Sequence, residues 1–271
     1  MRTDHGAEQL TSVWDEIDGV RIHGRVNASP APVSGPPIVF VHGLGVSTRY
    51  MEPTMRRLAG AYQVAALDFP GFGRSGSPRR SLDLPALADT LLRWLDARGI
   101  GPAVFVGNSF GCQVIVESIV REPARAVGLV LNAPTMDPAH RTVLAQVVRV
   151  IADIPHESLE LAWIVTRDYL RAGPYRLFVT LRSALADRIE EKLPRIAVPV
   201  AVLCGALDPV VRVDWADEVT QLVGRDCAGA PGATLHVVHD GSHALPFDEP
   251  DAVAGRILEL VTRTGLVRGS R

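Results

Sequence analysis

The chain has 271 residues and a mass of 29.2 kDa, enough for one large domain or two small ones. It carries 28 basic and 30 acidic residues, so its formal net charge is −2, and neither nucleic acid nor an anionic membrane surface is expected as a partner. A hydrophobic content of 47% and a charged content of 21% are ordinary for a folded globular protein and exclude a disordered chain.

Two classes of cofactor enzyme are excluded by the residues that they require. Lys192 is the only lysine in the chain, and no Gly-Lys pair exists that could form a phosphate-binding P-loop. A pyridoxal enzyme would have to use Lys192, which lies among Arg, Glu and Pro residues without any sign of a pocket. We therefore expect no cofactor. No metal is expected either, because His236 and His239 are three apart on a predicted strand and point to opposite faces.

The cellular setting is read from the cysteines and from the apolar runs. The three cysteines are far apart and form no C-x-x-C pair, which favours a reducing compartment. The first fifteen residues are charged without an apolar core, so no secretory signal is expected, and the run 196–207 is too short for the roughly 20 residues that span a bilayer. The sequence predicts a soluble, cytoplasmic protein of unknown oligomeric state.

Short apolar runs alternate with helical patterns along the chain. Residues 12–26 alternate in polarity around an Asp-Gly pair, which is typical of a tight hairpin. A helix is predicted over 84–95 from its 3.6-residue apolar spacing. Buried strands are predicted at 38–41, 64–67, 103–106, 127–131, 200–203 and 235–238. This alternation predicts an α/β fold with a mainly parallel sheet that helices cover on both faces.

One long segment interrupts the alternation. Residues 135–193 contain no strand-like run but have helical patterns over 141–154, 159–170 and 175–189. We interpret this segment as a helical cap over the sheet edge, and residues 1–134 and 194–271 as the core domain.

The strongest chemical signal is a G-x-S-x-G motif, GNSFG over residues 107–111. The motif alone is weak, but here it follows a predicted strand and precedes a predicted helix, the context of a nucleophile elbow. The flanking glycines fit a strained turn in which a Cβ would clash. Ser109 is therefore the candidate nucleophile.

A serine nucleophile needs a base and an acid that orients the base. His243, just after the last predicted strand, is the candidate base, with His239 as its competitor. Asp208 follows the strand at 200–203 and is the candidate acid, with Asp214 and Asp240 as substitutes. A neutral His243 would give activity an acid limb at roughly pH 6–7.5.

Taken together, five blocks resemble the α/β-hydrolase superfamily over nearly the whole chain. They are HGLG at 42–45, DFPGFGRS at 68–75, GNSFG at 107–111, GALD at 205–208 and GSH at 241–243. The resemblance implies an eight-stranded, mostly parallel sheet, a helical cap after the sixth strand and a Ser109-Asp208-His243 triad. It also implies an oxyanion hole made by the backbone N–H groups of Leu44 and Phe110.

A serine at the elbow implies acyl transfer, and we favour hydrolysis of a carboxylic ester or lactone. The GNSFG elbow also resembles that of C–C hydrolases acting on ring-fission products, but Ala244 stands where those enzymes usually carry an aromatic residue. A low-turnover ligand receptor on the same fold is the alternative outside enzymes. Substrate-binding aromatic residues are expected in the cap: Trp163, Tyr169, Tyr175 and Phe178.

Two further patterns are interpreted as structural. The G-x-G-x-x-G match at 71–76 is followed by Ser-Pro-Arg-Arg and not by a helix, so it does not predict a dinucleotide site. His42 is expected to hold the oxyanion loop, and Cys112 to be a small buried residue.

Overall fold

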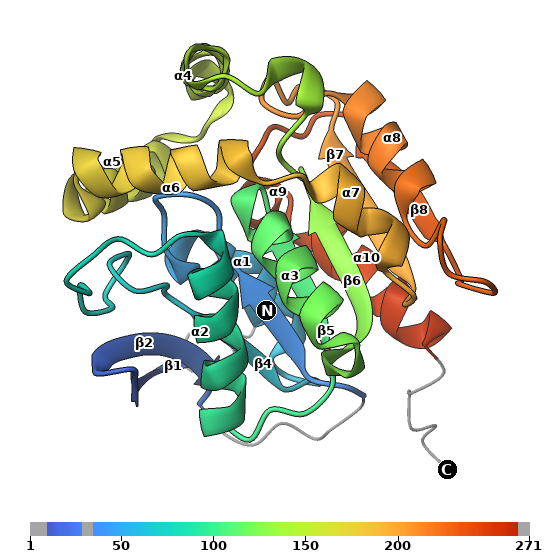
Figure 1. Cartoon of the computed structure of the whole chain (residues 1–271), viewed down its shortest axis with the longest axis horizontal. Coiled ribbons are helices and arrows are strands. Elements are labelled where there is room, and N and C mark those ends of the chain that lie inside the picture. Colours follow the sequence, from blue (N-terminus) through green and yellow to red (C-terminus); the bar gives the residue numbers. More distant parts are fainter. Residues whose placement is uncertain (1–9, 29–34, 265–271) are drawn as a thin grey trace, which may run out of the picture.

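A single eight-stranded sheet organises the computed structural model, which describes residues 10–28 and 35–264 (Figure 1). The expectation about a leader therefore rests mostly on residues outside the described part. The strands are β1 Leu10–Ile17, β2 Val20–Asn27, β3 Ile38–Val41, β4 Val64–Leu67, β5 Ala103–Asn108, β6 Ala126–Asn132, β7 Val200–Gly205 and β8 Ala233–Val238. Their order in the sheet is β1-β2-β4-β3-β5-β6-β7-β8. From β4 onward all neighbours are parallel, which confirms the predicted fold class.

The antiparallel hairpin at the sheet edge begins the fold, as the Asp-Gly pair predicts. Asp18 and Gly19 both have positive φ values, 52° and 71°, which is the conformation of a type I′ turn. The turn pairs Ile17 with Val20, and β2 continues antiparallel onto β4.

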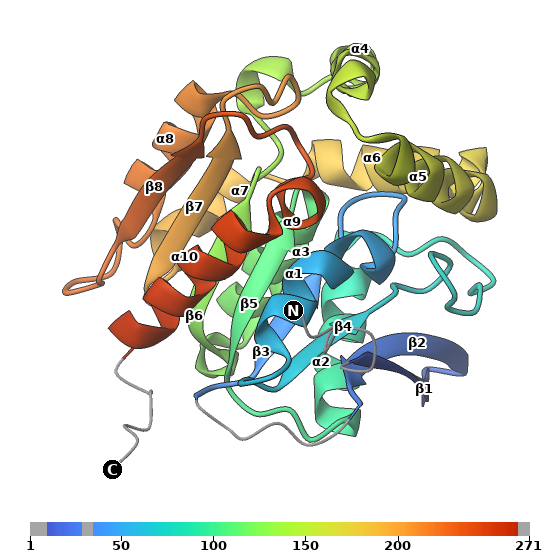
Figure 2. The ribbon, with the colours of Figure 1, turned by 180° about the vertical axis from the view of Figure 1, so that it is seen from behind.

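Helices cover both faces of the sheet. One face carries α2 Leu84–Ala97, α3 Phe110–Arg121 and α8 Val213–Leu222. The opposite face carries α1 Glu52–Leu58 and α10 Pro250–Arg263, with the short α9 Leu245–Asp248 beside them (Figure 2). The buried side chains divide into one apolar cluster on each side of the sheet. Because both faces are covered, the central strands consist of continuous buried apolar runs.

The segment between β6 and β7 is helical. It contains α4 Val143–Asp153, α5 Leu159–Ala172, α6 Pro174–Ala186 and α7 Ile189–Lys192. Figures 1 and 2 show α4, α5 and α6 lying across the carboxyl ends of the strands. We call residues 135–193 the cap segment.

One helix predicted in the cap segment is divided in the structure. The pattern at 175–189 predicts a single helix, but α6 ends at Ala186 and Asp187 has extended backbone geometry. The Asp187 carboxylate accepts a hydrogen bond from Gln113 Nε2 at 2.9 Å and pairs with Lys192. These polar contacts with α3 and α7 hold the chain out of the helix at this point.

No helix of the described ranges 10–28 and 35–264 is long and apolar enough to cross a bilayer.

Candidate functional site

Ser109 lies in a sharp turn between β5 and α3. Its backbone has φ 56° and ψ −122°, a conformation that L-residues seldom adopt and that stores strain. A Cβ at Gly111 would lie 2.2 Å from the carbonyl oxygen of Val41, and a Cβ at Gly107 would lie 2.8 Å from Ile115 Cδ1. Only glycine therefore fits at either position, which gives the G-x-S-x-G spacing its physical basis.

Asp208 and His243 meet at the carboxyl ends of β7 and β8. Asp208 Oδ2 lies 2.8 Å from His243 Nδ1, and Asp208 Oδ1 accepts hydrogen bonds from the backbone N–H groups of Val210 and Val211 at 2.7 and 2.9 Å. The carboxylate is buried, and three donors fix its orientation. The bond at Nδ1 leaves Nε2 of a neutral His243 as the free basic nitrogen.

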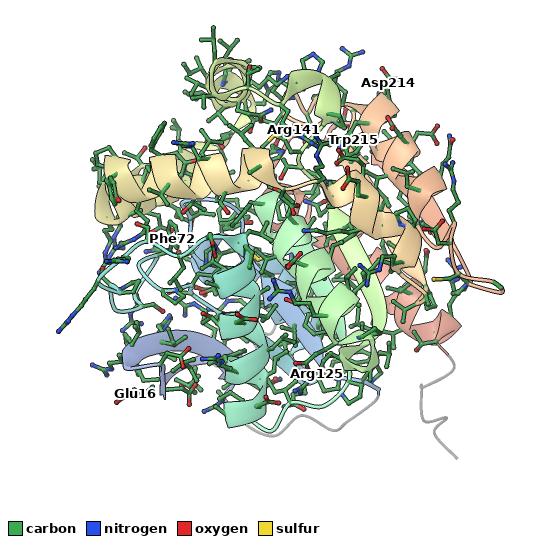
Figure 3. The ribbon with its side chains drawn as sticks, viewed as in Figure 1. Glu16, Phe72, Arg125, Arg141, Asp214 and Trp215 are labelled. Carbon is green, nitrogen blue, oxygen red and sulfur yellow. The ribbon has the colours of Figure 1, made fainter. Side chains whose placement is uncertain are left out.

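The residues considered as alternatives for the acid and the base are exposed at the surface. Asp214 is exposed at the outer end of α8 (Figure 3) and pairs with Arg212 at 3.0 Å. Asp240 and His239 are also exposed. Of the acids considered from the sequence, the structure brings Asp208 to His243.

A hydrogen-bond chain links three loops around Ser109, and the sequence did not predict it. Asn108 Nδ2 donates to the carbonyl oxygen of His243 at 3.2 Å, while Asn108 Oδ1 accepts from the Tyr50 hydroxyl at 2.8 Å. The same Tyr50 oxygen accepts from the Gly43 N–H at 3.0 Å. The elbow, the His243 loop and the loop after β3 are therefore fixed relative to one another.

His42 holds the loop that contains Leu44. Its Nε2 accepts a hydrogen bond from the Phe69 N–H at 3.0 Å, so its proton resides on Nδ1, which lies 2.8 Å from the Gly43 carbonyl oxygen. Burial lowers the pKa of His42 and keeps the ring neutral. Within the described residues no hydrogen bond uses the N–H of Leu44 or of Phe110, and both residues border the cavity.

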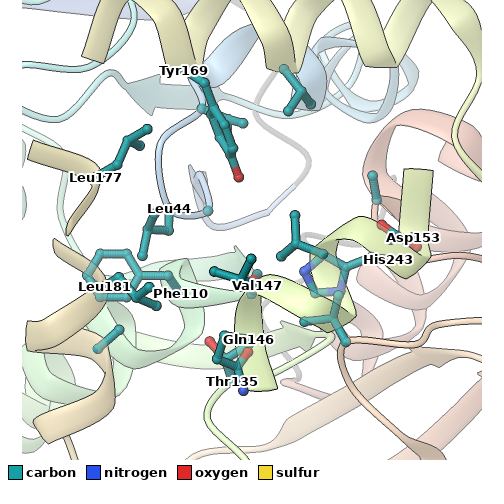
Figure 4. Close-up of a pocket in the computed structure, with 18 of the residues that line it drawn as sticks. Leu44, Phe110, Thr135, Gln146, Val147, Asp153, Tyr169, Leu177, Leu181 and His243 are labelled. Carbon is teal, nitrogen blue, oxygen red and sulfur yellow. The ribbon is translucent and has the colours of Figure 1, made fainter. Parts of the chain in front are cut away.

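The cavity has a volume of about 490 Å³ and lies between the sheet and the cap segment. Ser109 and His243 both line it, although no hydrogen bond joins their side chains, as is common in a free enzyme. Figure 4 shows Leu44 and Phe110 on one side and His243 on the other. The remaining lining is mainly aliphatic side chains from α4, α5 and α6.

The structure divides the four cap aromatics into two pairs. Tyr169 and Phe178 line the cavity, and the Tyr169 hydroxyl points into it (Figure 4). Trp163 and Tyr175 are 65% and 74% exposed and do not line it. The expectation that these two contact substrate is corrected here, because their helix faces point to solvent.

Carboxylates surround the imidazole of His243. Burial alone would lower its pKa, but Asp208, Asp153 and Glu157 together raise the pKa of His243 to about 9. Asp153 and Glu157 line the cavity from the cap segment, and neither was singled out in the sequence. The imidazole is therefore more basic than an isolated histidine, which moves the acid limb of activity above the range of roughly pH 6–7.5 expected from the sequence.

No metal or nucleotide arrangement is found in the described part of the chain. It contains no group of three or more His, Cys, Asp or Glu side chains that could hold a metal ion. The G-x-G-x-x-G segment leads into a loop, and the next helix, α2, begins only at Leu84.

Comparisons with known proteins identify the family of the chain. The model of the "Alpha/beta hydrolase family" matches residues 38–256. The dihydrolipoyllysine-residue acetyltransferase component of the acetoin cleaving system of Cupriavidus necator is 30% identical, over 91% of this chain and 68% of its own.

Two solved structures are similar in fold. The enol-lactonase of Burkholderia xenovorans LB400 has a TM-score of 0.76 and 19% identity, covering 92% of this chain and 100% of its own. A thermophilic esterase of Thermogutta terrifontis has a TM-score of 0.74 and 22% identity, covering 94% and 99%. The chain belongs to the alpha/beta hydrolase family and is an α/β-fold hydrolase.

Proposed function

We propose that the chain hydrolyses a carboxylic ester or lactone of a mainly apolar small molecule through an acyl-enzyme on Ser109. The observation that carries the proposal is the convergence on one cavity of Ser109, the His243–Asp208 pair and two unused backbone donors. The fold likeness to an esterase and an enol-lactonase is consistent with this reaction class.

In the proposed reaction, Ser109 Oγ attacks the carbonyl carbon while His243 Nε2 takes the hydroxyl proton. The N–H groups of Leu44 and Phe110 bind the developing oxyanion, each worth about 3–4 kcal/mol by analogy with subtilisin. The C–O bond then breaks, and His243 returns the proton to the leaving alkoxide. A water molecule, deprotonated by His243, then attacks the acyl-enzyme, the bond between the acyl carbon and Ser109 Oγ breaks, and His243 returns the proton to Oγ as the carboxylic acid leaves.

The cavity supports a medium-sized substrate. Its volume of about 490 Å³ lies within the range of small-molecule sites, roughly 300–1,000 Å³. Aliphatic side chains of α4 and α6, such as Val147, Leu177 and Leu181, supply much of the lining. These surfaces favour an apolar acyl group.

A fluorophosphonate probe tests the nucleophile, because its phosphonyl adduct resembles the tetrahedral intermediate. We expect one adduct per chain, located on Ser109 by mass spectrometry of peptides. Since His243 activates the serine, His243→Ala should prevent labelling. Turnover of an ester by the same preparation would then identify an enzyme.

The matched control is Ser77→Ala, which removes an exposed serine and should leave labelling intact. Labelling of Ser109 without turnover of any ester, lactone or thioester would favour the ligand receptor. Absence of an adduct in folded protein would refute the proposed mechanism.

The pH dependence follows from the carboxylates around His243. Only neutral imidazole accepts the serine proton, and its pKa is raised to about 9, so kcat/KM for a neutral ester should rise until about pH 9. Asp153→Asn or Glu157→Gln removes a negative charge, which should move this acid limb to lower pH. The measurement is kcat/KM between pH 5 and 10.

Glu160→Gln is the control for this series, since Glu160 is an exposed carboxylate on α5. Its profile should superimpose on that of the parent. A limb that stays at pH 6–7.5 and does not respond to the two substitutions would contradict this electrostatic account.

A further inference from the structure

Two carboxylates that the proposed mechanism does not use lie at the His243 end of the cavity. Asp153 is the last residue of α4, and Glu157 follows the short 3-10 turn Ile154–His156. Both line the cavity, and Figure 4 shows the Asp153 side chain beside the imidazole. Asp153 is only 4% exposed, and its Oδ1 has no hydrogen-bond partner in the described structure.

The charged neighbours of these carboxylates include one strong base, His243, which must be neutral to act in the proposed reaction. The groups that act on Asp153 are the imidazole and the backbone N–H of His243, Asp208 and His156, and those that act on Glu157 are Asp153, His243 and Asp248. None of them is an arginine or a lysine. Burial raises the pKa of Asp153, and burial together with Asp153 raises that of Glu157 to about 7.

Arg149, the arginine of α4, donates its hydrogen bonds to another segment of the chain. Arg149 lies one turn before Asp153, but its guanidinium donates to the carbonyl oxygens of Pro209 and Val210 at 3.3 and 2.8 Å. This contact anchors α4 on the loop that contains Asp208. The negative charge at this end of the cavity therefore has no fixed basic partner on the same helix.

Once His243 is neutral, a buried carboxylate oxygen without a hydrogen-bond partner is costly, and a cationic ligand group would reduce that cost. A divalent metal prefers six or more oxygen ligands, whereas an organic ammonium ion needs only one or two carboxylates and an apolar surround. Tyr169 is placed in the same cavity, close enough for Glu157 and Asp153 to contribute to its raised pKa of about 12. Its hydroxyl oxygen, which points into the cavity (Figure 4), offers a further partially negative atom to such a group.

We propose that Asp153 and Glu157 form a subsite for an organic ammonium group, so that the substrate is an ester of an amino alcohol. The inference rests on the proposed ester hydrolysis. The ammonium belongs on the alcohol side, because His243, which lies beside Asp153, delivers the proton to the leaving alkoxide. The aliphatic cavity wall then receives the acyl chain.

A pair of esters that differ in one atom tests the subsite. Butyrylcholine carries a trimethylammonium group, and 3,3-dimethylbutyl butyrate replaces its nitrogen with carbon at nearly equal volume. We expect kcat/KM, followed by titration of the released acid, to favour the cationic ester by about 10- to 100-fold. In Asp153→Asn and in Glu157→Gln the ratio should fall toward one.

The ratio is taken within each variant, so a general loss of activity cancels. Glu160→Gln is the matched control and should keep the parent ratio, because its carboxylate does not border the cavity. A parent ratio near one, with Ser109-dependent hydrolysis of the neutral ester, would overturn the subsite and leave the proposed function standing.

Binding of the alcohols alone gives a readout that does not depend on catalysis. Isothermal titration calorimetry should show that choline binds more tightly than 3,3-dimethyl-1-butanol, and that Asp153→Asn removes the difference. Equal binding of the two alcohols would overturn the subsite, whatever the fate of Ser109.

Discussion

Ser109→Ala is expected to lower kcat for ester hydrolysis by about 10⁴- to 10⁶-fold, as removal of the nucleophile does in serine proteases. Without the hydroxyl no acyl-enzyme can form. Water bound near the Leu44 and Phe110 amides would provide only the residual rate. The measurement is kcat with an activated ester, checked by single-turnover analysis for the absence of an acyl intermediate.

The variant should remain folded, because alanine adopts the same positive φ at no greater cost than serine and the glycines at 107 and 111 still admit the turn. Circular dichroism and thermal unfolding should match those of the parent. Ser77→Ala again provides the control on the surface. Undiminished turnover by a folded Ser109→Ala protein would eliminate Ser109 as the nucleophile.

The fold and the elbow could be predicted because their causes are local in sequence. Strands buried on both faces must be continuous apolar runs, and the run at 38–41 matches β3 residue for residue. The elbow is specified within five residues, since Gly107 and Gly111 are required by contacts made at the turn itself.

The charged end of the cavity could not be predicted, because it is assembled from distant segments. Asp153 is an unremarkable polar residue at the end of an apolar helix until folding brings α4 next to His243. The chain from Tyr50 through Asn108 to the His243 loop likewise joins residues 58 and 135 positions apart. No pattern in one segment contains this information.

The orientation of the cap side chains could not be predicted from the sequence either. The sequence of α4 has one apolar face, but Leu144 and Val148 on that face are more than half exposed while Gln146 and Asp153 are buried, so periodicity does not identify the face toward the cavity. For the same reason Trp163 and Tyr175 could not be separated from Tyr169 and Phe178. The cap residues that determine substrate selectivity can therefore be identified only from the folded structure.

Asp208→Asn is expected to lower kcat by about 10⁴-fold, the loss seen when an amide replaces the acid of a serine protease triad. The backbone N–H groups of Val210 and Val211 require an acceptor where Oδ1 lies, so the asparagine oxygen must take that place. Its NH₂ group then faces His243 Nδ1 and forces the imidazole proton onto Nε2. That tautomer cannot accept a proton from Ser109.

The same substitution also removes the charge that contributes most to raising the pKa of His243, so the remaining activity should show an acid limb at lower pH. Asp214→Asn, which changes an exposed carboxylate on α8, is the control and should behave as the parent does. The readouts are kcat and its pH profile for both variants. Near-normal activity of Asp208→Asn together with an inactive Asp240→Asn would transfer the orienting role to Asp240, even though its side chain lies exposed in the free protein.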